Sequence, residues 1–474
     1  MRQTLDAPVL GEATLQELRE GLRGEVIVPG DDRYEQARSV WNGMIDRQPA
    51  LVVRCAGVAD VLTALRFARS QDLLVAVRGG GHNFPGFGTC DGGIVIDTSP
   101  MKGIRVDPDA RTARAQAGVL WGELDHETQA FGLAVTGGLV SSTGIAGFTL
   151  GGGIGWLMRK HGMTVDNLLA ADLVTADGEL LTASAEQHPE LFWGLRGGGG
   201  NFGVVTSFDY RLHRLGPVVA GGAAFWPAER AEELLRFYRD WAPGLPDELT
   251  TLLAVLTAPP EPFIPEPLRG RPAVAVAACH AGALEEGLET LRPLKDLAPA
   301  ADLLGPIPYT ALQGMFDASA PHGIHAYFKN QYADELSDQA IAIVLEHAAA
   351  LPRLSPFAAL HVHHVQGAVD RVDAAATAFG GRGHRYVLNL LGLWQPPADP
   401  DAHIGWVRDF WTALRPVTAS APYLNFLADE GQERVRAAYG EDHYRRLVAL
   451  KDRYDPSNVF RLNQNVRPSA EEAG

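Results

Sequence analysis

The sequence has little cysteine, no long apolar run and no apolar leader. Its three cysteines, Cys55, Cys90 and Cys279, lie far apart and form no CxxC pair, so they indicate neither a disulfide framework nor a zinc site. We expect them to be small buried side chains. No stretch of about 18 apolar residues predicts a membrane span. The stretch from Met1 to Glu20 carries scattered acids where a signal peptide has an apolar segment. We therefore expect a cytoplasmic protein.

Clustered positive charge is also missing. The chain has 41 Lys and Arg against 57 Asp and Glu, a formal net charge of -16, which would repel a phosphate backbone and excludes nucleic acid as a partner. Walker A, HExxH and GxSxG motifs are absent, so the usual signatures of nucleotide, zinc-dependent and serine hydrolysis are lacking. The sequence gives no indication of the oligomeric state.

Glycine, in contrast, is abundant. It accounts for 52 of the 474 residues, about 11% against a typical ~7%. Many of these glycines gather in the N-terminal half, at residues 79–81, 137–138, 151–153 and 197–200. Since only glycine lets main-chain N–H groups approach a ligand without an intervening Cβ, such clusters suggest backbone packed against a bulky ligand.

Hydrophobic periodicity predicts an α+β fold in two regions. In the first region, residues 58–70 have helical spacing, and residues 168–174 and 204–212 are typical of strands. A second region begins near Gly216, where we expect an antiparallel sheet with helices on one face. The strands predicted there cover residues 273–279, 359–365 and 386–394, and the helices cover 284–297, 338–351 and 430–454.

Two glycine runs have the character of ligand loops. Residues 198–203 match GxGxxG, but a helix-like segment precedes them and a strand follows, the reverse of the Rossmann order. Residues 78–83, Arg-Gly-Gly-Gly-His-Asn, follow a strand and would expose successive N–H groups as a cradle for a pyrophosphate. A tight turn explains the same run, and His82 taken alone is more typical of a hydrogen-bonded surface imidazole. A further run at 137–153 interleaves hydroxyls with glycines.

Taken together, the motifs resemble a known family. VAVRGGGHN, IVIDTSPMKGI, TGIAGFTLGGGIGWLMRKHG, DNLLAADLVTADGEL, LFWGLRGGGGNFGVV, YLNF and DPSNVFRLNQN follow one another in order between Ala50 and Asn465. This series is similar to the berberine bridge enzyme-like branch of the vanillyl-alcohol oxidase and p-cresol methylhydroxylase superfamily. Within that branch, it most resembles the bacterial 6-hydroxy-D-nicotine oxidase-like group.

The resemblance implies a two-part FAD-binding domain of the p-cresol methylhydroxylase type, at residues 1–215 and 416–474, and a substrate domain at 216–415. It also implies FAD bonded through its 8α-methyl group to His82. Many relatives add a second bond from a cysteine, but Val140 takes that place here, so a single bond is expected. The other cofactor-binding residues that the resemblance implies are Arg78, Gly79, Gly80, Gly81, Asn83, Ser142, Thr143, Gly144, Gly147, Gly151, Gly153, Val204, Val205, Tyr423, Asn425, Asn463 and Asn465.

The family reaction passes a hydride from a substrate carbon to flavin N5 while a base removes a proton from an adjacent O–H or N–H, and O₂ then reoxidises the flavin. The family's YxNY motif ends here in Phe426, so the phenol that often serves as the base is absent. Alignment of Gly367 places His363 at the alternative base position, and strand alternation puts His361 on the same face. The catalytic candidates are therefore His363, His361 and Tyr423. These histidines alternatively only shape a pocket, form a surface cluster or bind a metal, for which no carboxylate partner is evident.

The substrate expected from the resemblance is a small or medium organic molecule of the secondary-metabolite, alkaloid or amine type, with O₂ as acceptor and no metal. Tyr386, Lys329 and Gln366 are further candidates for its pocket. Two alternatives stay open: a carbohydrate oxidase, and a non-oxidative flavoprotein that performs cyclisation or binding on the same scaffold.

Overall fold

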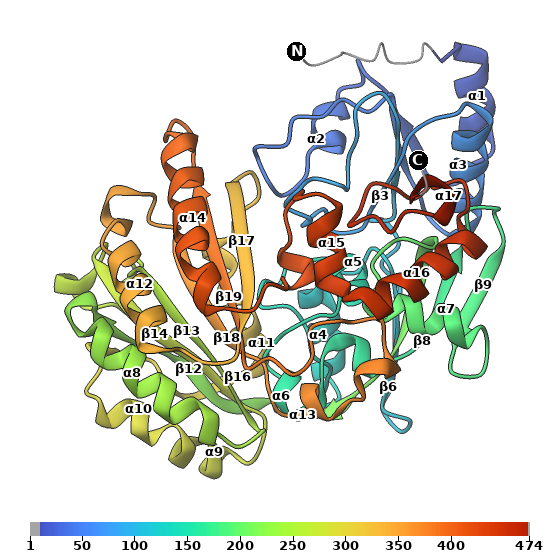
Figure 1. Cartoon of the computed structure of the whole chain (residues 1–474). Helices are drawn as coiled ribbons and strands as arrows, with labels where there is room; N and C mark the ends of the chain where they lie inside the picture. The colour runs from blue at the N-terminus through green and yellow to red at the C-terminus, as the bar shows by residue number, and fades with distance from the viewer. Residues whose placement is uncertain (1–9, 473–474) are drawn as a thin grey trace.

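The computed structural model describes residues 10–472, and it has two lobes (Figure 1). The first lobe holds residues 10–214 together with the C-terminal helices, and the second holds residues 218–417. The first nine residues, which begin the stretch examined for a signal peptide, lie outside the described part. No helix in the described part is long and apolar enough to cross a membrane.

Three small sheets form the first lobe. One has the order β1-β2-β4-β3, in which β4 is parallel to both β2 and β3, and another has the antiparallel order β5-β6-β10-β8-β9. The strands are Glu25–Ile27 (β1), Leu51–Arg54 (β2), Val75–Arg78 (β3), Ile94–Asp97 (β4), Ile104–Asp107 (β5), Thr112–Gln116 (β6), Leu168–Val174 (β8), Leu180–Ser184 (β9) and Val204–Arg211 (β10), with the pair Leu133–Ala134 (β7) and His213–Arg214 (β11).

Helices pack on these sheets through apolar side chains that recur at helical spacing. The helix predicted at 58–70 is present, and it buries Val61, Ala64, Leu65 and Ala68 at intervals of three and four residues. The helices of this lobe are Glu12–Glu20 (α1), Tyr34–Arg38 (α2), Val58–Ser70 (α3), Trp121–Gln129 (α4), Ile145–Leu150 (α5), Met158–His161 (α6), the 3₁₀ turn Thr164–Asn167 (η1), Pro189–Leu195 (α7), the 3₁₀ turn Leu424–Phe426 (η9), Gln432–Tyr439 (α15), Glu441–Tyr454 (α16) and Ser469–Glu472 (α17).

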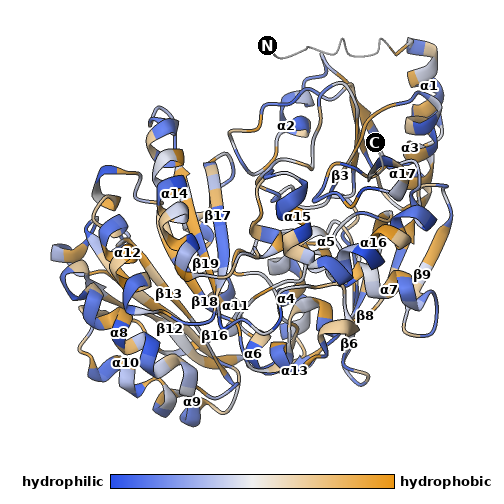
Figure 2. Ribbon diagram, viewed as in Figure 1, coloured by the Kyte–Doolittle hydropathy of each residue, from blue (hydrophilic) through white to orange (hydrophobic). Residues whose placement is uncertain are grey.

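A single antiparallel sheet forms the second lobe, in the order β15-β12-β14-β13-β18-β19-β17, with β16 beside β12. Helices α8, α9, α12 and α14 lie on one face, where apolar strand residues are buried beneath them (Figures 1 and 2). The elements are Val218–Pro227 (β12), Ala231–Trp241 (α8), Leu249–Thr257 (β13), Pro272–His280 (β14), Leu284–Thr290 (α9), Arg292–Asp296 (α10), Ala301–Asp302 (β15), Gly305–Pro308 (β16), Tyr309–Gln313 (α11), the 3₁₀ turn Asp317–Ser319 (η5), His325–Ala333 (β17), Asp338–Ala348 (α12), Ala359–His364 (β18), Ala368–Arg371 (α13), Tyr386–Trp394 (β19) and Pro400–Leu414 (α14).

Two predicted helices are each broken in the structure. The helix expected at 284–297 ends at Thr290 and restarts at Arg292, because Pro293 cannot donate the hydrogen bond that a continuous helix requires. The helical stretch at 430–454 is interrupted at Gly440, whose φ of 77° ends α15 and begins α16. The three cysteines are buried and unpaired, as predicted.

The C-terminal segment packs back onto the first lobe. Core residues of α15 and α16 join those of β6, β8 and β10 in one apolar cluster. Within the DPSNVF motif, the carboxylate of Asp455 accepts the backbone N–H groups of Val459 and Phe460 and pairs with Lys451 at 2.7 Å. Lys451 in turn donates to the backbone oxygen of Asn201 at 3.0 Å. The motif therefore anchors the chain end beside the glycine run at 197–200.

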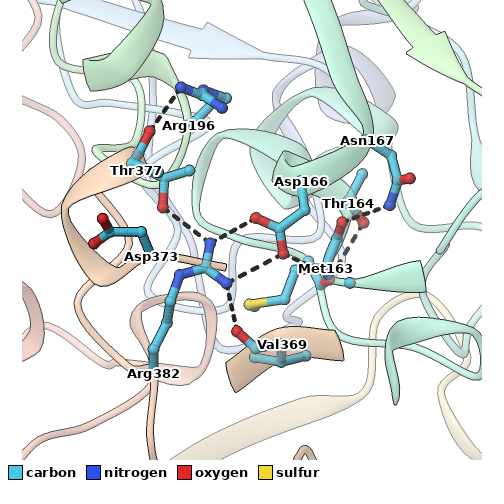
Figure 3. A network of polar contacts seen from close by, with 12 residues as sticks. Met163, Thr164, Asp166, Asn167, Arg196, Val369, Asp373, Thr377 and Arg382 are labelled. Carbon is cyan, nitrogen blue, oxygen red and sulfur yellow. Dashed lines mark hydrogen bonds and ion pairs between the residues drawn. The ribbon is translucent and has the colours of Figure 1, made fainter. Parts of the chain in front are cut away.

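A buried ion pair ties the two lobes together (Figure 3). Arg382, in the connection between β18 and β19, pairs with Asp166 of η1 at 2.5 Å, and both side chains are buried. Arg382 also donates to the backbone oxygen of Val369 and to the hydroxyl of Thr377. Removing either partner would leave the other as an uncompensated buried charge, so the pair couples this connection to the first lobe.

Candidate active site

A cavity of about 390 Å³ lies between the two lobes. The first lobe contributes all the glycines of the lining, set among apolar and polar side chains, and the second contributes side chains from β17, β18 and β19. Of the residues predicted to bind a cofactor, those that line the cavity are Arg78, Gly79, Gly80, Gly81, His82, Asn83, Thr143, Gly144, Gly147, Gly151, Val205, Asn425 and Asn463.

The glycine wall offers free backbone donors. The amides of residues 79–82 donate no hydrogen bond anywhere within residues 10–472, as expected of an anion cradle. Backbone crowding explains the residue type, because a Cβ on Gly80 would stand 2.4 Å from the nitrogen of Gly144. Gly81, with a φ of 71°, lets the chain turn away after the strand. Arg78 pairs with buried Asp97 at 2.8 Å and so steadies the strand end.

His82 is held from two sides. Its Nε2 lies 2.9 Å from the hydroxyl oxygen of Ser142, and its ring stacks on Trp41 with ring centres 5.3 Å apart. Its Nδ1 is 3.5 Å from the hydroxyl of Thr143, at the outer limit of a hydrogen bond. Burial, with a smaller contribution from His322, lowers the pKa of His82 to about 4. The ring is therefore neutral near pH 7, so one of its nitrogens carries a lone pair.

Tyr423 requires a correction. Its hydroxyl accepts the backbone N–H of Gly153 and the side-chain N–H of Asn425, both at 2.9 Å, and the residue is fully buried outside the cavity lining. The phenol is thus occupied in holding the glycine loop at 151–153, and we withdraw it as a catalytic candidate.

Four other predicted cofactor residues also lie outside the cavity lining. Ser142 contacts His82, Gly153 contacts Tyr423, and Val204 is buried in the first-lobe core. The side-chain oxygen of Asn465 is buried without a partner in the described part of the chain. These residues support the cavity wall from behind.

His361 and His363 face the cavity from β18, with Asn389 beside them on β19. The side-chain oxygen of Asn389 and Nε2 of His363 are buried, and neither has a hydrogen-bond partner among the described residues. Burial, and secondarily the neighbouring His361, lower the pKa of His363 to about 3; burial lowers the pKa of His361 to about 4. Both imidazoles are therefore neutral near pH 7, and each keeps a nitrogen lone pair that can accept a hydrogen bond. Buried polar atoms of this kind usually find a partner, which a bound molecule would supply here.

Tyr386, Lys329 and Gln366 are misplaced as pocket residues. Tyr386 packs beneath the helices against Tyr238, and Lys329 pairs with Glu430 at 2.5 Å. Gln366 accepts a hydrogen bond from Arg385 at 2.9 Å. None of the three lines the cavity. Side chains alternate between the faces of a strand, and for Tyr386 and Lys329 the sequence interpretation chose the face that the helices cover. Gln366 lies beyond the end of β18.

Several residues that line the cavity escaped the sequence interpretation. Trp41 and Phe328 are examples, and so is Asn389, which is the cross-strand neighbour of His361. Alternation along β19 could have identified Asn389, because residues at odd positions share the cavity face. Others that were missed include Phe84, Phe316, Leu391, Leu393 and Gln464.

The residues present fit an FAD. Free backbone N–H groups suit its pyrophosphate, the close approach of Gly80 to Gly144 gives a side-chain-free wall, and the buried side-chain oxygen of Asn463 is a spare acceptor on the cavity lining. Among the described residues, no group of three or more His, Cys, Asp or Glu side chains is arranged to hold a metal ion.

Comparison with known proteins gives a consistent result. Residues 49–184 match the FAD binding domain family, and residues 422–467 match the family described as berberine and berberine like. An FAD-linked oxidoreductase of Dictyostelium discoideum is 32% identical, with 96% of this chain and 97% of that protein covered. The (R)-6-hydroxynicotine oxidase of Paenarthrobacter nicotinovorans is 31% identical, with 94% of this chain and 97% of that protein covered.

The fold agrees with these matches. The crystal structure of 6-hydroxy-D-nicotine oxidase from Arthrobacter nicotinovorans superposes with a TM-score of 0.83 at 29% identity, covering 94% of this chain and 98% of that one. The predicted α+β fold of the p-cresol methylhydroxylase type is thereby confirmed, as is FAD as the cofactor. The chain belongs to the berberine bridge enzyme-like family of FAD-linked oxidoreductases.

Proposed function

We propose that this enzyme is an oxidase that holds FAD by a single covalent bond to His82 and oxidises a neutral aromatic molecule carrying a hydroxyl group. The observation that carries the proposal is the composition of the cavity. One wall includes free backbone donors and a neutral histidine, and the opposite wall is aromatic and aliphatic with His361, His363 and Asn389 among its polar groups.

The attachment at His82 is supported by the state of its ring. A neutral imidazole is a nucleophile, and the low pKa of His82 keeps it neutral across the physiological range. With Nε2 engaged by Ser142, Nδ1 is the nitrogen left to form the bond. Val140 lines the cavity where many relatives have a second attaching residue, and its side chain cannot form such a bond. None of the three cysteines lines the cavity in the described chain.

Bound FAD supplies an acceptor for two electrons as hydride, with O₂ as the final oxidant. The chain's own contribution is to orient the substrate and take its proton. Nε2 of His363 is a buried atom without a partner and can accept the proton of a substrate hydroxyl. The side-chain oxygen of Asn389 is the second atom available to fix that group. His361 is also neutral and lies on the same face of β18. It is the weaker candidate for the base, because only His363 has a buried ring nitrogen without a partner among the described residues.

The substrate class follows from what lines the cavity. No Asp or Glu is among the described lining residues, and its one arginine, Arg78, is already paired with Asp97. A cationic amine would therefore lose its hydration without gaining a counter-charge. Phe316, Phe328 and Phe426 give planar apolar surface, which favours an aromatic ring over a sugar. The amine and carbohydrate substrate classes thus become alternatives to the neutral aromatic alcohol.

The test is a panel of probes matched in size and added to the holoenzyme without oxygen. We expect 2-naphthalenemethanol to bleach the flavin absorbance, and 2-naphthylmethylammonium and cellobiose to do so at least about tenfold more slowly. Faster bleaching by the ammonium ion or the sugar would contradict the proposed substrate class. If aromatic alcohols perturb the flavin spectrum without bleaching it, the non-oxidative alternative would replace the oxidase.

A further inference from the structure

The histidine proposed to carry the flavin is oriented by a segment of the other lobe. Residues 313–324, which we call the clasp, run from the end of α11 through η5 to the start of β17. The clasp belongs to the second lobe, whereas His82 belongs to the first. Two neighbours of the His82 ring, Ser142 and Trp41, are nevertheless tied to the clasp.

The first tie runs through Asp317. Its carboxylate accepts the backbone N–H of Ser141 at 2.7 Å and the hydroxyl of Ser141 at 2.5 Å. Ser141 and Ser142 are the central residues of a turn closed by the N–H of Thr143 and the oxygen of Val140 at 3.1 Å. Because the turn is short, fixing Ser141 fixes the direction of the adjacent Ser142 hydroxyl, which lies 2.9 Å from Nε2 of His82.

The second tie runs through Trp41. Its indole N–H donates to the backbone oxygen of Ala320 at 2.9 Å, and its own backbone oxygen accepts the N–H of Gly323 at 2.9 Å. The indole ring therefore cannot swing freely, and it is this ring that stacks on His82. The face and one edge of the imidazole are thus set by contacts that reach Asp317, Ala320 and Gly323 of the clasp.

From this convergence we propose that Asp317 and the clasp are positioning elements for covalent attachment of the flavin, so that docking of the second lobe sets the rate at which His82 forms its bond. The inference rests on the attachment proposed above. In the bond-forming reaction, Nδ1 of His82 bonds to the 8α-methyl carbon, that methyl group gives up one hydrogen and Nε2 gives up its proton. O₂ takes the two hydrogens and becomes H₂O₂. Ser142 accepts the hydrogen bond from Nε2–H and so selects the tautomer whose lone pair is on Nδ1.

The experiment compares covalent flavin with total flavin in Asp317→Asn, Ser142→Ala and the wild type. Total flavin is read from absorbance of the native protein, and covalent flavin from fluorescence of the denatured gel band during incubation with added FAD. Asp338→Asn is the matched control, because Asp338 pairs with Arg236 and Arg239 on the exposed side of α12, outside the cavity lining. A general loosening of the fold would lower both readings, whereas a loss of positioning lowers only the covalent fraction.

We expect Asp317→Asn and Ser142→Ala to bind FAD but to form the bond about tenfold or more slowly, and Ser142→Thr, which keeps the hydroxyl, to recover most of the rate. The control should match the wild type. Bond formation at the wild-type rate in both Asp317→Asn and Ser142→Ala would overturn the inference and leave the proposed attachment intact. A wild-type band without flavin fluorescence would overturn the attachment itself. If Asp317→Asn does not fold, Ser142→Ala alone decides, since it removes only one exposed hydroxyl.

Discussion

The two walls of the cavity are built on different principles. On the first lobe, residues 79–81, 144 and 199–200 present backbone between side chains such as His82, and the second lobe contributes no glycine to the lining. On the second lobe, the wall is a sheet face whose chemistry resides in side chains at alternate positions. Backbone N–H groups offer the same hydrogen-bond donors wherever the glycines are present. The side chains on a sheet face, in contrast, can be exchanged at each position without disturbing the strand. The first wall therefore carries the signature of the cofactor, and the proposed substrate class rests mainly on the second.

The largest expected effect is a side chain added to the glycine wall. In Gly80→Ala, the new Cβ would lie 2.4 Å from the backbone nitrogen of Gly144. Relieving this clash requires a shift of one of the two backbone segments that form the cradle. We expect overpacking of about 1–3 kcal/mol and a protein purified without flavin, judged by absorbance per protein. Gly147→Ala is the control, because it lines the same cavity with nothing within 4 Å of its Cβ position. Equal flavin content in the two variants would contradict the backbone account of this wall.

Next in size is removal of the proposed base. We expect His363→Ala to lower kcat/KM with an aromatic alcohol by about 10²–10⁴-fold, with flavin content unchanged, because the residue belongs to the other wall. His361→Ala should cost less. The measurement is steady-state peroxide production together with flavin absorbance. If His361→Ala is the more damaging variant, the roles of the two histidines are reversed.

A smaller effect is expected at Asn389. Replacing it with Leu removes one buried acceptor that faces the cavity and leaves the apolar wall in place. A lost hydrogen bond of about 1–3 kcal/mol should raise KM for the alcohol roughly 10–100-fold while kcat changes little. An unchanged KM would show that Asn389 does not contact the substrate.

A last effect, which concerns stability and not activity, is on its pH dependence. Burial lowers the pKa of His363 to about 3, and burial with the nearby Arg159 lowers the pKa of His364 to about 2, against an ordinary 6.5. Below pH 6.5 these histidines therefore become protonated in the unfolded chain but stay neutral in the folded chain. The free energy of unfolding consequently falls as the pH drops from 6.5 toward 3. The slope is at most about 1.4 kcal/mol per pH unit for each histidine. Urea unfolding of wild type and His363→Ala measures it, and identical slopes would contradict the buried neutral state.

The sequence predicted the first wall better than the second, and the reason is physical. His82, Gly144 and Asn463 lie where the motif series placed them, because a cradle of backbone donors needs particular glycines at particular spacings. Strand β8 and helix α3 also match their predicted bounds, since α3 has regular apolar spacing and β8 is an apolar run that ends at a turn.

The second wall depends on which face of each strand turns toward the cavity. His361 and His363 were placed on the correct face, whereas Tyr386 and Lys329 were assigned to it although they lie beneath the helices. Which side chains face the cavity depends on the register of β17, β18 and β19. That register is set by strand pairing and cannot be read from the local sequence. Tyr423 was misread for another reason: its hydroxyl is taken by Gly153, a residue 270 positions away.

The most direct test of the account is the fate of the flavin in His82→Ala after denaturation. The wild-type band on a denaturing gel should fluoresce as flavin, and the His82→Ala band should not, while the native variant still binds FAD through the intact glycine wall. A wild-type band without fluorescence, or a His82→Ala band that keeps it, would contradict covalent attachment at this histidine.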